Sequence, residues 1–164
     1  MPNRFLLPVL VAVVLACTWG PSSAATPKPA ASDDTYGATA AWLTRYVPDL
    51  AQAMNRSGAA QATFEFSISH CVVDWKTEVT LPSQRRMRFA FSIPFDKVTR
   101  VEAVTNFDGD PFVIRMFGVV HQTAPAVKDL PDQPVGVSSQ VASDQIAGAL
   151  QRLATLCQLP NAGQ

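Results

Sequence analysis

The segment Arg86–Phe95 constrains the fold of this chain more than any other stretch. Apolar residues occupy every second position and alternate with residues of a more polar or smaller kind: Met87, Phe89, Phe91, Ile93 and Phe95 against Arg86, Arg88, Ala90, Ser92 and Pro94. Successive side chains of a strand point to opposite faces, so this period of two predicts a half-buried strand with an aromatic face toward the core. Such a face needs a covering layer, which we expect from a helix near each end of the chain.

The first residues have the layout of an export signal. A short basic start precedes the apolar run Phe5–Ala16, which is too short to cross a bilayer of roughly 30 Å as a helix. Two cleavage sites compete. The small residues of Ser23–Ala25 suit a general signal peptidase and make residues 1–25 the signal. The segment Val14–Cys17 resembles a bacterial lipobox, which makes residues 1–16 the signal and Cys17 the lipidation candidate.

Either cleavage predicts an exported protein, as a membrane-anchored lipoprotein or as a soluble periplasmic or secreted one. A lipid-modified Cys17 would hold the protein on a membrane surface. The proline-rich residues 26–33 read as a flexible tether, residues 34–159 as a single domain and residues 160–164 as a tail. The chain carries 13 Lys and Arg against 13 Asp and Glu, and this balance argues against nucleic acid as a partner.

Export also determines how the remaining cysteines are interpreted. Cys71 and Cys157 form an even pair in an oxidising compartment, which predicts a disulfide. The alternative is a free reactive thiol at Cys71 beside His70, because a nucleophilic cysteine needs a nearby base and some exposure. Adjacent strand residues point to opposite faces, which disfavours that alternative.

A helix is predicted from Asp33 or Asp34, as the cap, to about Asn55. An apolar stripe at three- and four-residue steps runs along it. Pro48 interrupts the stripe and predicts a kink, or two short helices with Pro48 starting the second.

A second helix is predicted at the C-terminal end, from Ser143 or Asp144 as the cap to about Cys157. Its apolar stripe consists of Ile146, Leu150, Leu153 and Cys157. The stripe places Cys157 on the buried face, as a disulfide to the sheet requires.

Alternating residues predict strand structure over Thr63–Thr80, but the alternation changes parity between Ile68 and Cys71. One extra residue near Ser69 and His70 restores the period, either as a bulge or as a tight connection between two strands. Both alternatives remain open from the sequence.

The strands after Phe95 are predicted at Val98–Asn106 and Phe112–Val120, joined by the hairpin signal of Asp108 followed by Gly109. The polar, proline-containing segment His121–Pro134 predicts an exposed loop, and the alternation over Val135–Val141 predicts one more strand. The chain is therefore expected to form an α+β domain, with about five or six strands in an antiparallel meander between the two helices.

Three segments resemble a loose group of uncharacterised exported bacterial proteins with a pleckstrin-homology-like core: Cys71–Trp75, Phe91–Val98 and Ala142–Cys157. The resemblance implies a bent meander that forms a partial barrel, capped by the C-terminal helix and tied to it by a disulfide. It implies no activity, because function does not follow from fold. The long N-terminal helix is a departure, since pleckstrin-homology domains begin with the sheet.

Phosphoinositide binders of that fold carry a basic residue, a gap, and then two basic residues separated by one position. Lys76, Arg86 and Arg88 have this form, and together with Arg85 they are candidates for contact with an anionic lipid or polysaccharide. The alternative is a charged outer face beside an exposed sheet edge.

The sequence contains no nucleophile elbow, phosphate loop, cofactor fingerprint or metal-ligand spacing. We therefore expect a non-enzymatic envelope domain, without cofactor or metal, that binds a protein partner or a small envelope ligand. One alternative is a peripheral module that binds anionic lipids. A second is a hydrolase or thiol-dependent enzyme that uses His70, Cys71 or Asp74.

Overall fold

The computed structural model describes residues 35–52 and 61–159. The predicted signal, the tether, the tail and the lipidation candidate Cys17 lie outside these ranges. Within them, no helix has the length and apolar character needed to cross a membrane.

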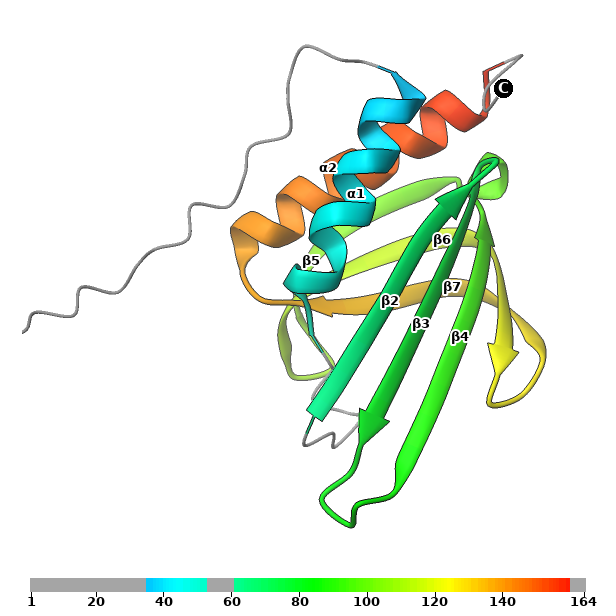
Figure 1. Ribbon diagram of the computed structural model, residues 1–164. Coiled ribbons are helices and arrows are strands. Elements are labelled where there is room, and N and C mark those ends of the chain that lie inside the picture. Colours follow the sequence, from blue (N-terminus) through cyan, green and yellow to red (C-terminus); the bar gives the residue numbers. More distant parts are fainter. Residues whose placement is uncertain (1–34, 53–60, 160–164) are drawn as a thin grey trace, which may run out of the picture.

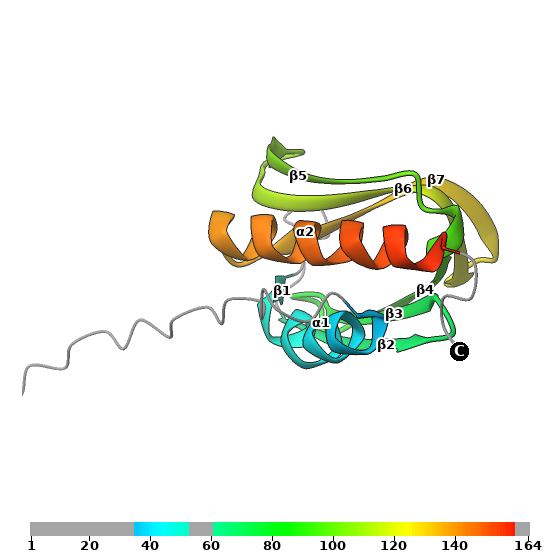
Figure 2. The same cartoon turned by 90° about the horizontal axis from the view of Figure 1, so that it is seen from above.

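The described residues form an α+β domain with two α-helices and a seven-stranded antiparallel sheet, which confirms the predicted α+β class and exceeds the five or six strands expected. The elements in chain order are α1 (Tyr36–Leu50), β1 (Ala51–Gln52), β2 (Gln61–Ser69), β3 (Val72–Thr80), β4 (Arg86–Pro94), the 3-10 helix η2 (Phe95–Lys97), β5 (Arg100–Phe107), β6 (Asp110–Ala124), β7 (Lys128–Val137) and α2 (Gln140–Cys157). The sheet curves around α2 into a nearly closed shape (Figure 1). Seen from above, α2 lies between the β5–β7 layer and the layer of α1 and β2–β4 (Figure 2).

The strand order is β1-β7-β6-β4-β3-β2, with β5 paired to β6 outside this path. The predicted simple meander, in which each strand pairs with the next one along the chain, is wrong at β4. This strand pairs with β6 and not with the following strand β5. The long strand β6 pairs with both β4 and β5. Its N-terminal part pairs with β5, and its C-terminal part pairs with β4.

The change of partner coincides with a bend in β6. The pairing of β6 with β7 shifts register between Phe117 and Val120, and Gly118 within this bulge has a φ of 145°. A bulge increases local twist and turns a strand, so it lets the two halves of β6 belong to differently oriented parts of the sheet.

The N-cap of helix α1 is the residue after the predicted caps Asp33 and Asp34. Thr35 is the N-cap, and its hydroxyl accepts a hydrogen bond from the Ala38 amide at 3.3 Å. The helix is one element with Pro48 in its last turn, so the prediction of a second helix that starts at Pro48 is wrong. It also ends before Asn55, because Ala51 and Gln52 pair with β7 as β1.

The change of parity after Ile68 arises from a tight connection between β2 and β3. Of the two predicted alternatives, the tight connection is therefore confirmed and the bulge is wrong. His70 and Cys71 form the turn, with φ values of 47° and 61°. Two consecutive residues of positive φ suit a two-residue hairpin turn.

The predicted loop His121–Pro134 is wrong, because β6 continues to Ala124 and β7 starts at Lys128. Two prolines lie within β7. Pro131 falls at the register shift, without a partner, and Pro134 lies opposite Arg115. On its other edge β7 pairs with β1 at Gly136 and Val137, and no further residue of 35–52 or 61–159 pairs there. Within these ranges the two prolines therefore lie beside an edge without a partner strand, where a strand tolerates a missing amide.

The predicted strand over Val135–Val141 is too long, and the predicted cap of the last helix is wrong. Strand β7 ends at Val137, and Ser139 caps α2 by accepting a hydrogen bond from the Ala142 amide at 3.1 Å. Ser143 lies one turn inside the helix, where its hydroxyl donates to the Val113 carbonyl at 3.3 Å. The predicted end of this helix at Cys157 is confirmed.

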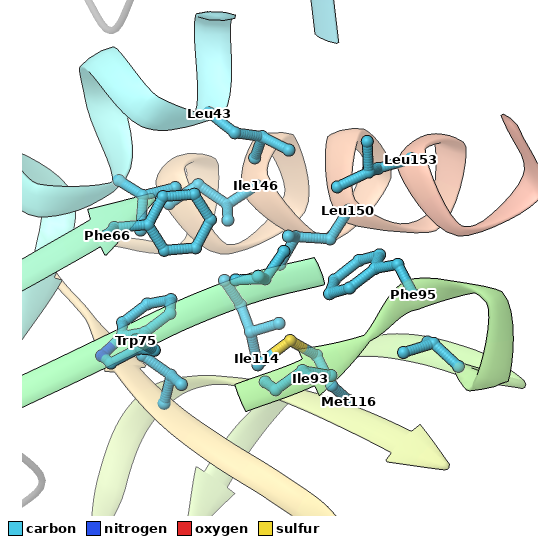
Figure 3. Packing of buried hydrophobic residues seen from close by; sticks show 14 of the residues in the cluster. Leu43, Phe66, Trp75, Ile93, Phe95, Ile114, Met116, Ile146, Leu150 and Leu153 are labelled. Atoms are coloured by element: carbon cyan, nitrogen blue, oxygen red, sulfur yellow. The ribbon is translucent and has the colours of Figure 1, made fainter. Parts of the chain in front are cut away.

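The core lies where α2 meets the inner face of the sheet (Figure 3). The predicted stripe of α2 is buried, and it packs with Leu43 of α1, Ile93 of β4 and Ile114 of β6. The main chain of Cys71 donates to the Tyr36 hydroxyl at 3.1 Å, which joins α1 to the β2–β3 turn.

Candidate functional site

The apolar face of β4 is covered along only part of its length. Phe95, just after the strand, and Ile93 are fully buried, and Phe91 is 8% exposed, whereas Phe89 and Met87 are only half-buried. Both helices lie toward the end of the sheet that carries the β2–β3 turn (Figure 1). Neither α1 nor α2, the two α-helices of the described ranges, covers the opposite end of the inner face.

A cavity of about 600 Å³ lies at this opposite end, between β2–β4 on one side and β6–β7 on the other. Its lining consists of Gln52, Phe64, Trp75, Thr77, Val79, Phe89, Phe91, Phe107, Arg115, Gln122, Lys128, Leu130, Asp132, Gln133, Pro134, Val135 and Gly136. Consecutive residues of β7 from 132 to 136 contribute, and neighbouring residues of a strand face opposite ways. The cavity therefore borders an edge of β7, where both faces of the strand contribute.

One wall of the cavity is aromatic. Trp75 lies opposite Phe66 on β2 and Phe91 on β4, so the three side chains share the inner face. The Trp75 ring meets Phe66 and Phe64 edge-on, with centroids 5.1 Å and 6.5 Å away. Its indole Nε1 donates to the Thr77 hydroxyl at 3.1 Å. These contacts hold the indole in one orientation, and the wall is preformed.

The wall from β6 and β7 carries a fixed ion pair. The Arg115 guanidinium donates through Nε to Asp132 Oδ2 at 2.9 Å, and Nη2 contacts the same oxygen. The guanidinium also lies over the rings of Phe107 and Phe117, 4.9 Å and 4.6 Å from their centroids. Only 28% of the Arg115 and 22% of the Asp132 side chain is exposed. Stacking and pairing together hold the cation in place and balance its charge.

The remaining polar side chains of this wall differ in how they are held. The Gln122 amide donates to the Ala126 carbonyl at 3.0 Å, and the Gln133 amide donates to the Pro134 carbonyl at 2.8 Å. Lys128, at the start of β7, is exposed and has no ion-pair partner within the described ranges. Lys128 is therefore the cation of the lining that is available to a ligand.

Sequence reasoning missed the cavity. The alternation of Trp75, Thr77 and Val79 indicates a shared inner face, but nothing local to Arg115 and Asp132 points to the other wall. These two residues meet because of the β6–β7 register, which places Asp132 opposite Phe117.

The predicted disulfide is present. Cys71, in the β2–β3 turn, is bonded to Cys157 at the end of α2, with the two Cα atoms 5.7 Å apart. Cys71 is therefore not a free thiol, and the alternative, a reactive thiol activated by His70, is wrong. The His70 ring instead shares a hydrogen bond with the Ser69 hydroxyl at 2.9 Å.

The basic residues predicted to contact an anionic lipid or polysaccharide are Lys76, Arg85, Arg86 and Arg88, and all four are exposed. Lys76 lies opposite Glu65 and pairs with it at 3.2 Å, and Arg86 pairs with Glu78 at 3.5 Å. Arg88 lies opposite Glu78. Acidic residues thus alternate with the cations on this outer face, and the anionic contact stays a prediction.

A row of polar residues on the outer face brings Ser92, His121 and Asp129 side by side across β4, β6 and β7. His121 Nδ1 lies 2.6 Å from Asp129 Oδ1, with both side chains largely exposed. The Ser92 hydroxyl makes no hydrogen bond with His121, so the contact between nucleophile and base that activates a serine is not formed.

Among residues 35–52 and 61–159, no three His, Cys, Asp or Glu side chains come together in a way that could hold a metal ion. No protein-family model, no curated protein and no solved structure matches the chain.

Proposed function

We propose that this protein is an exported, non-enzymatic binding protein of the cell envelope, which holds a small apolar ligand inside its curved sheet. The observation that carries the proposal is the cavity of about 600 Å³ beside Trp75, Phe89 and Phe91. Cavities of this size, with mostly apolar walls and a few placed polar groups, are typical of sites for small molecules.

The polar groups of the cavity support binding over chemistry. Arg115 is engaged with Asp132, and the Trp75 indole with Thr77. Because these side chains hold one another, the walls are organised before a ligand arrives, which reduces the entropy lost on binding.

A bulky substitution at Leu130 tests this proposal. Leu130 lines the cavity and lies opposite the buried Val120, so Leu130→Trp should fill part of the space. We expect it to weaken the binding of Nile red, an uncharged apolar dye, about tenfold or more, measured by dye fluorescence on the oxidised protein.

Val141→Trp is the matched control, because Val141 is 54% exposed in the first turn of α2 and does not line the cavity. Circular dichroism confirms that both variants are folded. Equal dye affinity in the native protein and in a folded Leu130→Trp variant would contradict the proposal.

Export is part of the same proposal, and it is supported by the signal-like N-terminus and the disulfide. The intact mass of the protein recovered from its own envelope should begin at Thr26, or at Cys17 with added acyl chains. The first result would make the ligand a soluble molecule of the periplasm or medium, and the second would place the cavity next to a membrane. A mass that begins at Met1 would contradict export.

The likeness to exported proteins with a pleckstrin-homology-like core also belongs to this proposal. It is supported by the β2–β4 meander, the curvature of the sheet and the C-terminal helix joined to it by a disulfide. The pairing of β4 with β6 and the helix α1 before the sheet are departures from that pattern.

A further inference from the structure

We infer that the ligand of the cavity is an amphiphile with an apolar chain and a single anionic head, a carboxylate or a phosphate. This inference rests on the proposed binding function and names the class of ligand. It follows from how apolar and charged groups are distributed over the lining.

The aromatic and the charged side chains of the cavity lie on different strands. The aromatic side chains come mainly from β2, β3 and β4, among them Phe64, Trp75 and Phe89. The charged side chains come from β6 and β7. A ligand that fills the cavity therefore meets apolar surface on one side and charge on the other, which favours an amphiphile over a wholly apolar or wholly polar molecule.

One row of the sheet joins the two regions. Trp75 on β3 lies opposite Phe91 on β4, Phe91 opposite Gln122 on β6, and Gln122 opposite Lys128 on β7. Cross-strand partners share a face, and neighbouring strands are about 4.8 Å apart, so the backbones of Phe91 and Lys128 are separated by about 10 Å. A chain lying along this row would have its apolar part on Phe91 and Trp75 and its head at Lys128.

The sign of the head follows from the charges of the lining. Its charged residues within 35–52 and 61–159 are Arg115, Lys128 and Asp132, and Arg115 and Asp132 neutralise each other. Lys128 is left as an excess positive charge at the rim, which attracts an anion and repels a cation. Because this excess is a single charge, one anionic head suffices to balance it.

Calorimetric titration of the oxidised protein with four probes tests the inference. The probes are oleate, oleyl phosphate, oleyl alcohol and acetate, each kept below its aggregation concentration. Oleate or oleyl phosphate should bind about fivefold more tightly than oleyl alcohol, which has the same chain without the charge. Acetate should not bind measurably, and the tighter of the two anionic probes identifies the head group.

Two lysine variants locate the charge. Lys128→Gln should weaken the binding of oleate about fivefold and leave that of oleyl alcohol unchanged. Lys76→Gln is the matched control, since Lys76 follows Trp75 directly but points to the outer face. Raising the salt concentration from roughly 0.05 to 0.5 M should weaken oleate binding to the native protein and much less to the Lys128 variant.

Equal binding of oleate and oleyl alcohol, unaffected by Lys128→Gln, would overturn the anionic head while the proposed binding of apolar ligands stands. A loss of oleate affinity in Lys76→Gln alone would also overturn it, and would place anion contact on the outer basic face. If none of oleate, oleyl phosphate and oleyl alcohol binds, the inference fails, and if Nile red does not bind either, the proposed function fails with it.

Discussion

Replacing both Cys71 and Cys157 by alanine is expected to lower the free energy of unfolding by roughly 4–5 kcal/mol. The two residues are separated by 86 positions, and a bridge across so long a loop removes much conformational freedom from the unfolded chain. A domain of this size has a total stability of about 5–15 kcal/mol, so the loss is a large part of it.

The disulfide also has a structural role, because it joins the β2–β3 turn to the last turn of α2. Without it, these elements are held by side-chain packing and by the contact of the Cys71 amide with Tyr36. Urea denaturation with and without reductant measures the effect. Reductant should shift the midpoint of the native protein and leave that of the double alanine variant unchanged. An unchanged midpoint for the reduced native protein would show that the bridge does not contribute.

Gly118→Ala is expected to destabilise the protein by about 3 kcal/mol or more. A Cβ atom at this position would lie 2.3 Å from the carbonyl oxygen of Lys97 and 3.0 Å from the Cα of Val98. Both contacts are with backbone, which cannot rotate away as a flexible side chain can. The φ of 145° adds strain for any residue with a Cβ, so crowding and backbone strain act together.

Gly109→Ala is the matched control for this substitution. Gly109 also has a positive φ, of 85°, but a Cβ there would meet nothing within 4 Å. It should lose about 1 kcal/mol, from backbone strain alone. Denaturation midpoints of the two variants separate crowding from strain. Equal losses in both would mean that the close approach of β6 to η2 does not determine the effect.

The predictions that succeeded rest on short-range patterns. The alternation around Phe91 identified β4 and its buried face, and the stripe through Leu150 identified the buried face of α2. Asp108 and Gly109 identified the β5–β6 turn. Each pattern is set by the geometry of one element, so neighbouring residues contain the information.

The predictions that failed depend on neighbours in space. Pro131 and Pro134 indicated a loop, but they lie in a strand, and in the described part of the chain one edge of β7 has partners only at Gly136 and Val137. A proline is excluded only where its missing amide is needed, and that depends on the adjacent strand. Ser143 resembled a cap, but the hydroxyl that caps α2 belongs to Ser139, two residues after the end of β7.

The sequence by itself determined the α+β class, the strand around Phe91, the buried face of the last helix and the pairing of Cys71 with Cys157. The tertiary structure decided that β4 pairs with β6, that α1 and α2 both lie toward one end of the sheet, and that Trp75 and Lys128 border one cavity. The physical reason is that period and cap are local properties of a chain, whereas the register between strands far apart in sequence is set by how the whole sheet bends. In this protein that bend lies at Gly118, where only a residue without a Cβ lets β6 approach Lys97.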